Sequence, residues 1–493
     1  MRTQESNSAR KTRRIRPAAS LPILQPHAAG IDLGNAEHFV CAPSDSVAQG
    51  QSPVRSYGVF NPQLDEMVEW LKSCGVKTVA MESTGVMWIP VYQKLEAAGF
   101  EVALVNTKGL KHVPGRKSDV LDCQWIQQLH SYGLLGGSFR PSDIICRLRT
   151  LLRHRENLVE SMGRETQHMQ KAMQEMGLHL HVVLSDVCGQ TGLRIIDAIL
   201  AGQRDPKELV ALRDWRVKRS TPQEMEAALR GNWREELIFV LGQSRRIYKL
   251  LQEEVSTLDS QIISLLQTVP AAPAVTEPTP ATSPAVAVNP QSSAPVSSSK
   301  SRRKKRKRLS FSSHPLPVDI RPQLHKIMGV DLTLIPGLND IGVLIILSEI
   351  GSDLRRWRDS GAFAAWLGLA PGSKISGGRV LSSKTPHVVN RVAVLLRLAA
   401  LTIGRTDSCL GSFYRRISHK HGPPKAMTAT ARKLAELIYH LMVNREEFVS
   451  MDTKKYEERV TQQKIIRLSR EAKKLGLSLV PSLTSDPKAA NAQ

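Results

Sequence analysis

The stretch His27-Ala-Ala-Gly-Ile-Asp-Leu33 is a short apolar segment near the start of the chain, and it predicts a β-strand that carries an acid at its end. Lys77-Thr-Val-Ala-Met-Glu82 has the same form, and Glu101-Val-Ala-Leu-Val-Asn106 predicts another strand. The other elements predicted here are strands at 39–42 and 54–60 and helices at 62–74 (capped by Asn61), 92–98 and 118–135. Strands that alternate with helices predict an α/β layer with some parallel pairing.

From about residue 144 the pattern becomes helical. Two long, charged, amphipathic stretches at 148–176 and 233–266 fit an antiparallel helix pair or a coiled coil. A second, mostly helical globular unit is predicted at 321–449. Its segment Leu334-Ile-Pro-Gly-Leu-Asn-Asp-Ile-Gly342 is typical of the start of a helix-hairpin-helix, whose turn can present N–H groups to a phosphate, but an ordinary packing turn fits equally well.

Residues 269–299 are rich in Pro, Ala, Ser and Thr and carry almost no charge, so they predict a linker. In the basic run Arg302-Arg-Lys-Lys-Arg-Lys-Arg308, a tether that contacts phosphates is favoured over a solvated charge block or a nuclear-localisation signal. The predicted organisation is a disordered basic arm at 1–26, an α/β domain at 27–143, a helical region at 144–268, a linker at 269–320, a C-terminal domain at 321–449 and a charged, frayed tail at 450–493.

The composition favours a polyanionic partner. The 493 residues include 68 Lys and Arg against 45 Asp and Glu, a net charge of +23, and nucleic acid is preferred over a membrane surface or charge that serves solubility alone. The six cysteines form no Cys-x-x-Cys pair, which argues against a zinc ribbon or a disulfide framework and suits a reducing cytoplasm. No apolar run reaches the roughly 18–20 residues that span a bilayer, so no membrane partner is predicted.

Four acids form the first candidate site: Asp32, Glu82, Asp119 and Asp122. The first two end apolar strands, and side chains at the carboxyl ends of neighbouring strands converge in space. The last two are three residues apart on a predicted helix and share a face. Mg²⁺ is the natural occupant of such a cluster, because it prefers hard oxygen ligands and serves phosphoryl transfer. Each acid taken alone is more often a turn or cap residue.

Basic residues accompany these acids, as a site that handles phosphates requires. Those that precede Asp119 are Lys108, Lys111, Arg116 and Lys117. In the C-terminal domain, Ser376-Gly-Gly predicts an exposed hydroxyl in a flexible loop, and Arg379, Lys384, His387 and Arg391 follow it with charge that can hold a phosphate. Taken alone, a Ser-Gly-Gly segment is more often an ordinary loop than a catalytic one. The aromatic residues Trp357, Phe363 and Trp366 are predicted to be core rather than base-stacking platforms.

The motifs Gly30-Ile-Asp-Leu-Gly34, Met81-Glu-Ser-Thr-Gly85 and Gly115-Arg-Lys-Ser-Asp-Val-Leu-Asp122 resemble, in order, those of DEDD-type insertion-sequence transposases, the IS110 family. Segments in the helical middle, at 184–194, 200–206 and 231–235, are similar too. So is the C-terminal series Pro-Gly-Leu, Gly-Leu-Ala-Pro and Ser-Gly-Gly, which ends at Gly378. Two departures are a serine at 118, where the family has a threonine, and a missing glycine before Asn390-Arg391.

The resemblance implies a fold and a mechanism. The N-terminal domain would be RuvC-like, that is, RNase H-like, and Asp32, Glu82, Asp119 and Asp122 match the family's four acids. Ser376 matches the family's covalent nucleophile, with Ser373 as the fallback and Ser382 or Ser383 less favoured. The implied partners are donor and target DNA, a structured bridge RNA that pairs with both, and further copies of the chain joined through the helical middle.

Two other function classes remain open on the sequence. A RuvC-like, Mg²⁺-dependent nuclease or junction resolvase would cut DNA without covalent serine chemistry, and its C-terminal domain would only bind. A degraded, non-catalytic nucleic-acid-binding protein is the third class, and the presence of all four acids and the serine argues against it.

Overall fold

The computed structural model describes residues 22–83, 85–105, 119–272, 314–386, 388–449 and 453–480. The chain divides into two compact units, Met1–Arg140 and Pro141–Gln493. The basic arm up to residue 21, the basic run at 302–308 and most of the predicted linker lie outside the described residues. None of the helices in the described ranges is long and apolar enough to cross a membrane.

The first unit is an α/β domain built on a five-stranded mixed sheet of order β3-β2-β1-β4-β5. Its elements are β1 (Ala28–Leu33), β2 (Glu37–Cys41), η1 (Ser44–Ser46), β3 (Val54–Gly58), α1 (Asn61–Ser73), β4 (Thr78–Glu82), α2 (Trp88–Ala97), β5 (Glu101–Val105) and α3 (Asp119–Ser131). β1, β4 and β5 run parallel, while β2 pairs antiparallel with both β1 and β3. The five predicted strands and the parallel pairing are confirmed.

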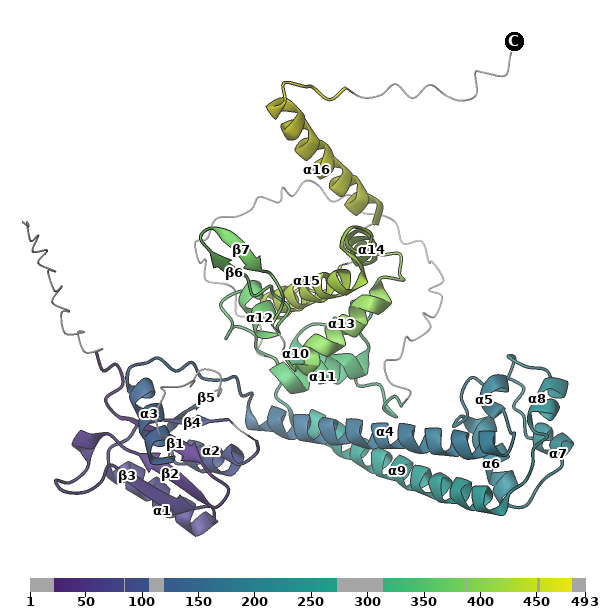
Figure 1. Cartoon of the computed structure of the whole chain (residues 1–493), viewed down its shortest axis with the longest axis horizontal. Coiled ribbons are helices and arrows are strands. Elements are labelled where there is room, and N and C mark those ends of the chain that lie inside the picture. Colours follow the sequence, from purple (N-terminus) through teal and green to yellow (C-terminus); the bar gives the residue numbers. More distant parts are fainter. Residues whose placement is uncertain are drawn as a thin grey trace, which may run out of the picture. The chain divides into compact units, whose positions relative to one another are not determined.

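The two faces of the sheet are covered by different helices, as Figure 1 shows. On one face, Ile31 and Met81 pack into a core with residues of α1 and α2. On the other, Ala80 packs with Ile126 of α3. The prediction that Asn61 caps α1 is wrong, because the helix already begins at Asn61 after an extended Phe60, and no side chain caps it. Helix α3 ends at Ser131, four residues earlier than predicted.

The second unit begins with two long helices, α4 (Asp143–Glu175) and α9 (Glu235–Thr268), which lie side by side in Figure 1. Arg155 of α4 contacts Asp259 of α9, whereas Met169, further along α4, packs near Leu241, so the pair is antiparallel as predicted. At their far end lies a helical tip that consists of α5 (Leu180–Val183), α6 (Gln190–Leu200), α7 (Pro206–Ala211) and α8 (Pro222–Ala228).

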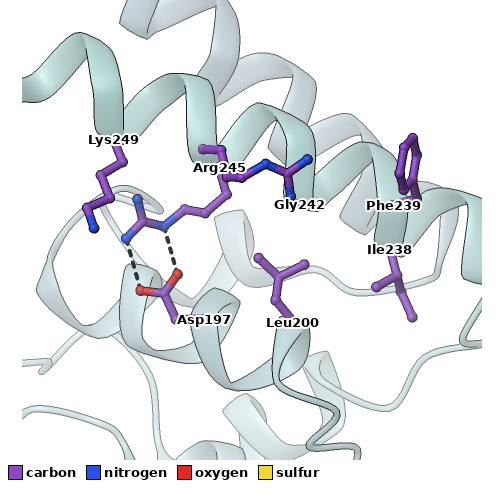
Figure 2. Close-up of a pocket in the computed structure, with 8 residues that line it drawn as sticks. Asp197, Leu200, Ile238, Phe239, Gly242, Arg245 and Lys249 are labelled. Carbon is purple, nitrogen blue, oxygen red and sulfur yellow. Dashed lines mark hydrogen bonds and ion pairs between the residues drawn. The ribbon is translucent and has the colours of Figure 1, made fainter.

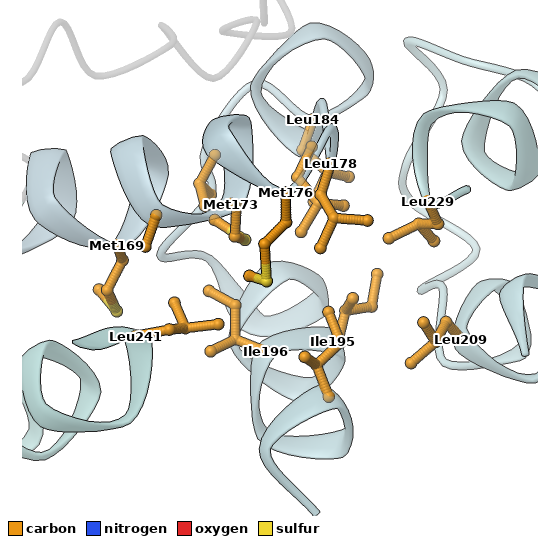
Figure 3. Close-up of a cluster of buried hydrophobic side chains, with 14 of the residues drawn as sticks. Met169, Met173, Met176, Leu178, Leu184, Ile195, Ile196, Leu209, Leu229 and Leu241 are labelled. Carbon is orange, nitrogen blue, oxygen red and sulfur yellow. The ribbon is translucent and has the colours of Figure 1, made fainter. Parts of the chain in front are cut away.

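The tip has a core of its own (Figure 3). Met173 and Met176, at the end of α4, pack against Ile195 and Ile196 of α6, and all four side chains are fully or almost fully buried. Flexible methionine side chains fill the irregular space between helices of different direction. The tip is therefore held to the helix pair by apolar packing.

The remainder of the second unit is mostly helical. It contains α10 (Arg321–Met328), η3 (Leu332–Leu334), α11 (Asp340–Ile350), α12 (Ser360–Trp366), β6 (Lys374–Ser376), β7 (Arg379–Ser382), α13 (Arg391–Ile403), α14 (Cys409–His421), α15 (Pro423–Asn444) and α16 (Thr453–Lys474). Trp357, Phe363, Trp366 and Tyr439 contact one another. Phe363 is fully buried and Trp357 is 9% exposed, which confirms the prediction that these two are core, whereas Trp366 is only half-buried.

The prediction of a frayed C-terminal tail is wrong for part of its length. Helix α16 covers 453–474, a segment rich in Lys, Arg, Glu and Gln, which favour helices. An ion pair between Arg467 and Glu471, one turn apart, adds to its stability.

Candidate active site

Two of the predicted acids lie at neighbouring positions on one edge of the sheet. β1 and β4 are parallel, with Ile31 opposite Met81, so Asp32 and Glu82 follow that pair at the carboxyl ends of adjacent strands. Side chains alternate between the faces of a sheet. Because Ala80 packs toward α3, Glu82 projects from that same face, and so does Asp32, two residues after Gly30.

Helix α3 brings Asp122 to this edge. The side-chain amide of Gln127 donates a hydrogen bond to the Ala28 carbonyl (3.2 Å), and His130 Nε2 lies 2.9 Å from Thr78 Oγ1. The carboxyl end of α3 therefore lies at the beginnings of β1 and β4, and its amino end lies where those strands finish. Asp122 is consequently on the same side as Asp32 and Glu82.

The contact between α3 and the sheet is close because residue 30 is glycine. A Cβ at Gly30 would lie 2.3 Å from the Gln127 nitrogen and 2.5 Å from the Cys123 carbonyl oxygen, which no side chain can do without moving the helix. Burial raises the pKa of the Cys123 thiol to about 12, and the negative charges of Cys41 and Asp32 add to this effect. This coupling is consistent with the Asp32 carboxylate lying near the first turns of α3.

The predicted metal site is only partly described by the structure. Asp32, Glu82 and Asp122 are all half-buried. Asp119 is the first residue of α3, one turn before Asp122, but its side chain is outside the described part of the chain. Among the side chains that are described, no three acids, histidines or cysteines form a group that could hold a metal ion. The predicted Lys108, Lys111, Arg116 and Lys117 lie outside the described residues.

Ser376 lies in a β-hairpin and not in a flexible loop, which corrects the sequence-based prediction. β6 and β7 pair antiparallel, with Ser376 directly opposite Arg379. The two residues between them, Gly377 and Gly378, have φ of +54° and +74°, as the tight turn of a hairpin requires. Ser376 is exposed, as predicted, and its side chain shares a face of the hairpin with that of Arg379.

The other predicted phosphate-binding residues of this unit differ in their surroundings. Lys384 is exposed just after the hairpin, where its carbonyl accepts a hydrogen bond from the Gly372 N–H (3.0 Å). Arg391, at the start of α13, forms an ion pair with Glu156 of α4, so its charge already has a protein partner. His387 lies outside the described residues.

The turn that resembles a helix-hairpin-helix start is occupied by protein groups. Asn339 Oδ1 accepts a hydrogen bond from the Gly342 N–H (2.9 Å), at the amino end of α11. Gly337 packs against the Ala399 carbonyl of α13, where a Cβ would lie 2.9 Å from the oxygen. These contacts favour the packing interpretation over an open phosphate site.

A pocket of about 450 Å³ lies elsewhere, between α6 and α9 (Figure 2). Asp197 and Arg245 form a two-pronged ion pair in it, at 2.8 and 2.9 Å. Its other lining residues are Leu200, Ile238, Phe239, Gly242, Arg246 and Lys249. None of the predicted site residues is among those that line it.

The buried hydrogen bond between Thr78 and His130 is not predicted by the sequence, yet it fixes the direction of α3 and so the position of Asp122. A single histidine near a helix end carries no signal for such a role, since its partner is 52 residues away.

Comparison with protein families matches the two regions that carry the candidate residues. A family model described as a transposase, of the DEDD type and the IS110 group, matches residues 29–177, which include all four acids. A second model, described as Transposase IS116/IS110/IS902 family, matches residues 331–415, which include Ser376 and Arg379. No curated protein matches the chain. The chain thus belongs to the IS110 family of transposases, enzymes that cut and rejoin DNA in the transposition of insertion sequences.

Proposed function

We propose that the chain cuts and rejoins DNA with a Mg²⁺-binding site made of Asp32, Glu82, Asp119 and Asp122 and with Ser376 as the nucleophile. The observation that carries the proposal is the meeting of three separate elements, β1, β4 and α3, at one edge of the sheet, each with an acid at that end. Acids brought together from distant parts of a chain repel one another unless a cation balances them.

The donor set suits magnesium. Carboxylate oxygens are the ligands that Mg²⁺ prefers. Because the ion keeps several waters in its coordination shell, one or two carboxylates from the protein are enough to bind it. When bound, it stabilises the charge that develops on a phosphoryl group. The chain's own contribution is to hold Asp32 and Glu82 on rigid strands and to fix α3 behind them through Gly30 and Thr78. The strand order, with β2 running opposite to the other four strands, supports an RNase H-like assignment.

Ser376 is suited to attack a phosphodiester because the hairpin exposes its hydroxyl with a guanidinium opposite. In the proposed step the Ser376 Oγ forms a bond to phosphorus and loses its proton, while one P–O ester bond breaks and the leaving oxygen departs with the electron pair and gains a proton. The phosphoserine link conserves the bond energy, so a DNA hydroxyl can later reverse the step. Arg379 would stabilise the charge on the phosphoryl oxygens, and Lys384 would hold a flanking phosphate. Arg391 would hold another only where that phosphate displaces Glu156 from the guanidinium.

The proposal extends to partners and organisation. A structured bridge RNA would select donor and target DNA, and the net charge of +23 is consistent with two nucleic-acid partners. Further copies of the chain would associate through the helical region at 144–268, where α9 exposes Phe239, Ile247 and Leu250. The segments 27–143 and 321–449 would then be the two catalytic domains, in the cytoplasm.

A cleavage assay tests the acid site. Purified protein, the noncoding RNA of the element and end-labelled donor DNA are incubated with Mg²⁺, and cleavage is measured for Asp122→Asn and Glu82→Gln. We expect both variants to lose cleavage, because each removes a negative ligand. Glu66→Gln, an exposed acid on α1 across the sheet, is the control and retains activity. Wild-type rates in both acid variants would contradict the site, and cleavage that is independent of Ser376 would indicate a metal nuclease instead.

A further inference from the structure

The loop between α7 and α8 presents a tryptophan to solvent. Trp215 is 79% exposed, more than Phe60 at 72%. It lies between the two segments that match the transposase families, 29–177 and 331–415. A tryptophan usually buries most of its large apolar surface, so one displayed in water on an ordered loop indicates a partner that covers it.

The loop that carries Trp215 is fixed by hydrogen bonds on both sides of the ring. The N–H of Asp214 donates to Thr191 Oγ1 on α6 (3.1 Å), and the Val217 N–H donates to the Asp214 carbonyl (3.0 Å). The guanidinium of Arg213 donates to the carbonyls of Val217 and Ser220, the latter at 2.9 Å. The backbone that carries the ring is therefore held in place before any partner binds, which lowers the entropy lost on binding.

Positive charge surrounds the ring. The Arg216 guanidinium lies 5.5 Å from the centroid of Trp215, and Lys218 and Arg219 are exposed on the same loop. Asp214 is the one acid in this loop. Its carboxylate accepts a hydrogen bond from the backbone N–H of Arg216 (2.9 Å) and lies 3.8 Å from the Arg216 guanidinium. Three exposed cations thus flank an exposed aromatic ring with one carboxylate among them.

We propose that Trp215 is a stacking platform for an unpaired base of a single-stranded nucleic acid, with Arg216, Lys218 and Arg219 on the neighbouring phosphates. An aromatic face takes any base, and cations along its rim follow the backbone. A duplex would not use the ring in this way, because its bases already stack on each other. The centre of a protein–protein interface is poor in charged residues, whereas the exposed side chains next to Trp215 are charged, so a protein partner fits less well. The site shares no residue with Ser376 or the four acids and does not depend on their roles.

The test measures the affinity of the full chain for labelled 20-nucleotide oligouridine and oligothymidine by fluorescence anisotropy. EDTA is present so that no cleavage occurs. One stacked base contributes about 1–3 kcal/mol, so we expect Trp215→Ala to weaken binding by roughly 5- to 150-fold. Trp215→Tyr keeps an aromatic face and retains most of the affinity. The control is Val182→Ala on α5, which removes another exposed apolar side chain (57% exposed) from the tip and leaves affinity unchanged.

A second variant tests the phosphate contacts. Replacing Arg216, Lys218 and Arg219 together by glutamine should reduce the slope of log affinity against log salt by about 2, because each contact on a single strand contributes about 0.7. A loss confined to oligouridine assigns the site to RNA, a loss confined to oligothymidine assigns it to DNA, and both support the proposal. Wild-type affinity of Trp215→Ala for both oligomers would overturn it. A change in the sedimentation of the free protein with unchanged binding would identify a protein-docking residue instead and would also overturn it.

Discussion

His130 of α3 and Thr78 of β4 share a buried hydrogen bond, Nε2 to Oγ1 at 2.9 Å, although they are 52 residues apart. The bond ties the carboxyl end of α3 to the beginning of the central strands, so the amino end of the same helix, with Asp119 and Asp122, lies at the edge where Asp32 and Glu82 are found. The direction of one helix thus decides whether the four acids can act together.

Acidification should weaken the first unit. Burial lowers the pKa of His130, partly offset by Glu101, and burial alone lowers that of His38. Below the ordinary histidine pKa of about 6.5, the unfolded chain binds more protons than the folded one, so stability falls as pH decreases. We expect the urea midpoint to drop between pH 7.5 and 5.5 and this drop to shrink in His130→Gln. His27→Gln, an exposed histidine, should leave the pH dependence as it is. An equal pH dependence in wild type and His130→Gln would refute the assignment to His130.

Gly30→Ala should move α3 off the sheet. The added Cβ would lie within 2.5 Å of backbone atoms of Gln127 and Cys123. Overpacking of this kind destabilises a domain by about 1–3 kcal/mol. We expect a lower melting temperature together with loss of cleavage. Gly136→Ala is the matched control, because nothing lies within 4 Å of its added Cβ. Unchanged melting and activity in Gly30→Ala would show that α3 does not depend on this contact.

The buried ion pair between Arg155 and Asp259 should hold α4 and α9 in register. Two of its N–H···O contacts measure 2.5 and 3.2 Å, and Arg155 also donates to the His314 carbonyl. Arg155→Ala leaves a buried carboxylate without its partner and should destabilise the second unit by about 3–5 kcal/mol. Replacing both residues, by methionine and leucine, should recover much of the loss.

The exposed pair Lys171 and Glu175 on the same helix provides the comparison for that measurement. Lys171→Ala should change stability by less than about 1 kcal/mol. Chemical unfolding measures all of these variants, and similar losses for Arg155→Ala and Lys171→Ala would mean that burial adds nothing to the Arg155 pair.

The glycine turn should be required for the position of Ser376. Gly377 has φ of +54°, which a β-branched residue adopts only at a penalty of about 1–2 kcal/mol. Gly377→Val should therefore disturb the pairing of Ser376 with Arg379 and reduce strand joining, while Gly377→Asn should retain it, since Asn-Gly also forms this turn. Equal activity in the two variants, with normal melting curves, would indicate that the hairpin geometry does not matter.

Much of the first unit could be predicted from the sequence, because β1 and β4 are apolar runs with an acid at their ends. The positions of Asp32 and Glu82 at strand ends follow from that pattern. The placement of Asp122 does not, since it depends on long-range contacts of α3 with Gly30 and Thr78.

In the second unit, the local sequence pattern did not predict the structure around Ser376 or the exposure of Trp215. The hairpin at Ser376 has the two-glycine turn that favours such a structure, but its strands are only three and four residues long and their apolar side chains are exposed. A tryptophan is usually buried in a core, and only the fold shows that the ring of Trp215 faces solvent.

If Ser376 forms a covalent bond to DNA, a protein–DNA adduct is the direct product. Protein, Mg²⁺, noncoding RNA and a labelled donor DNA that traps the cleaved state are mixed and separated on a denaturing protein gel, and mass spectrometry locates the modified residue. We expect an adduct on Ser376 that disappears in Ser376→Ala and in Asp119→Ala and persists in Ser373→Ala. An adduct that persists in Ser376→Ala, or DNA cut by that variant without any adduct, would contradict it.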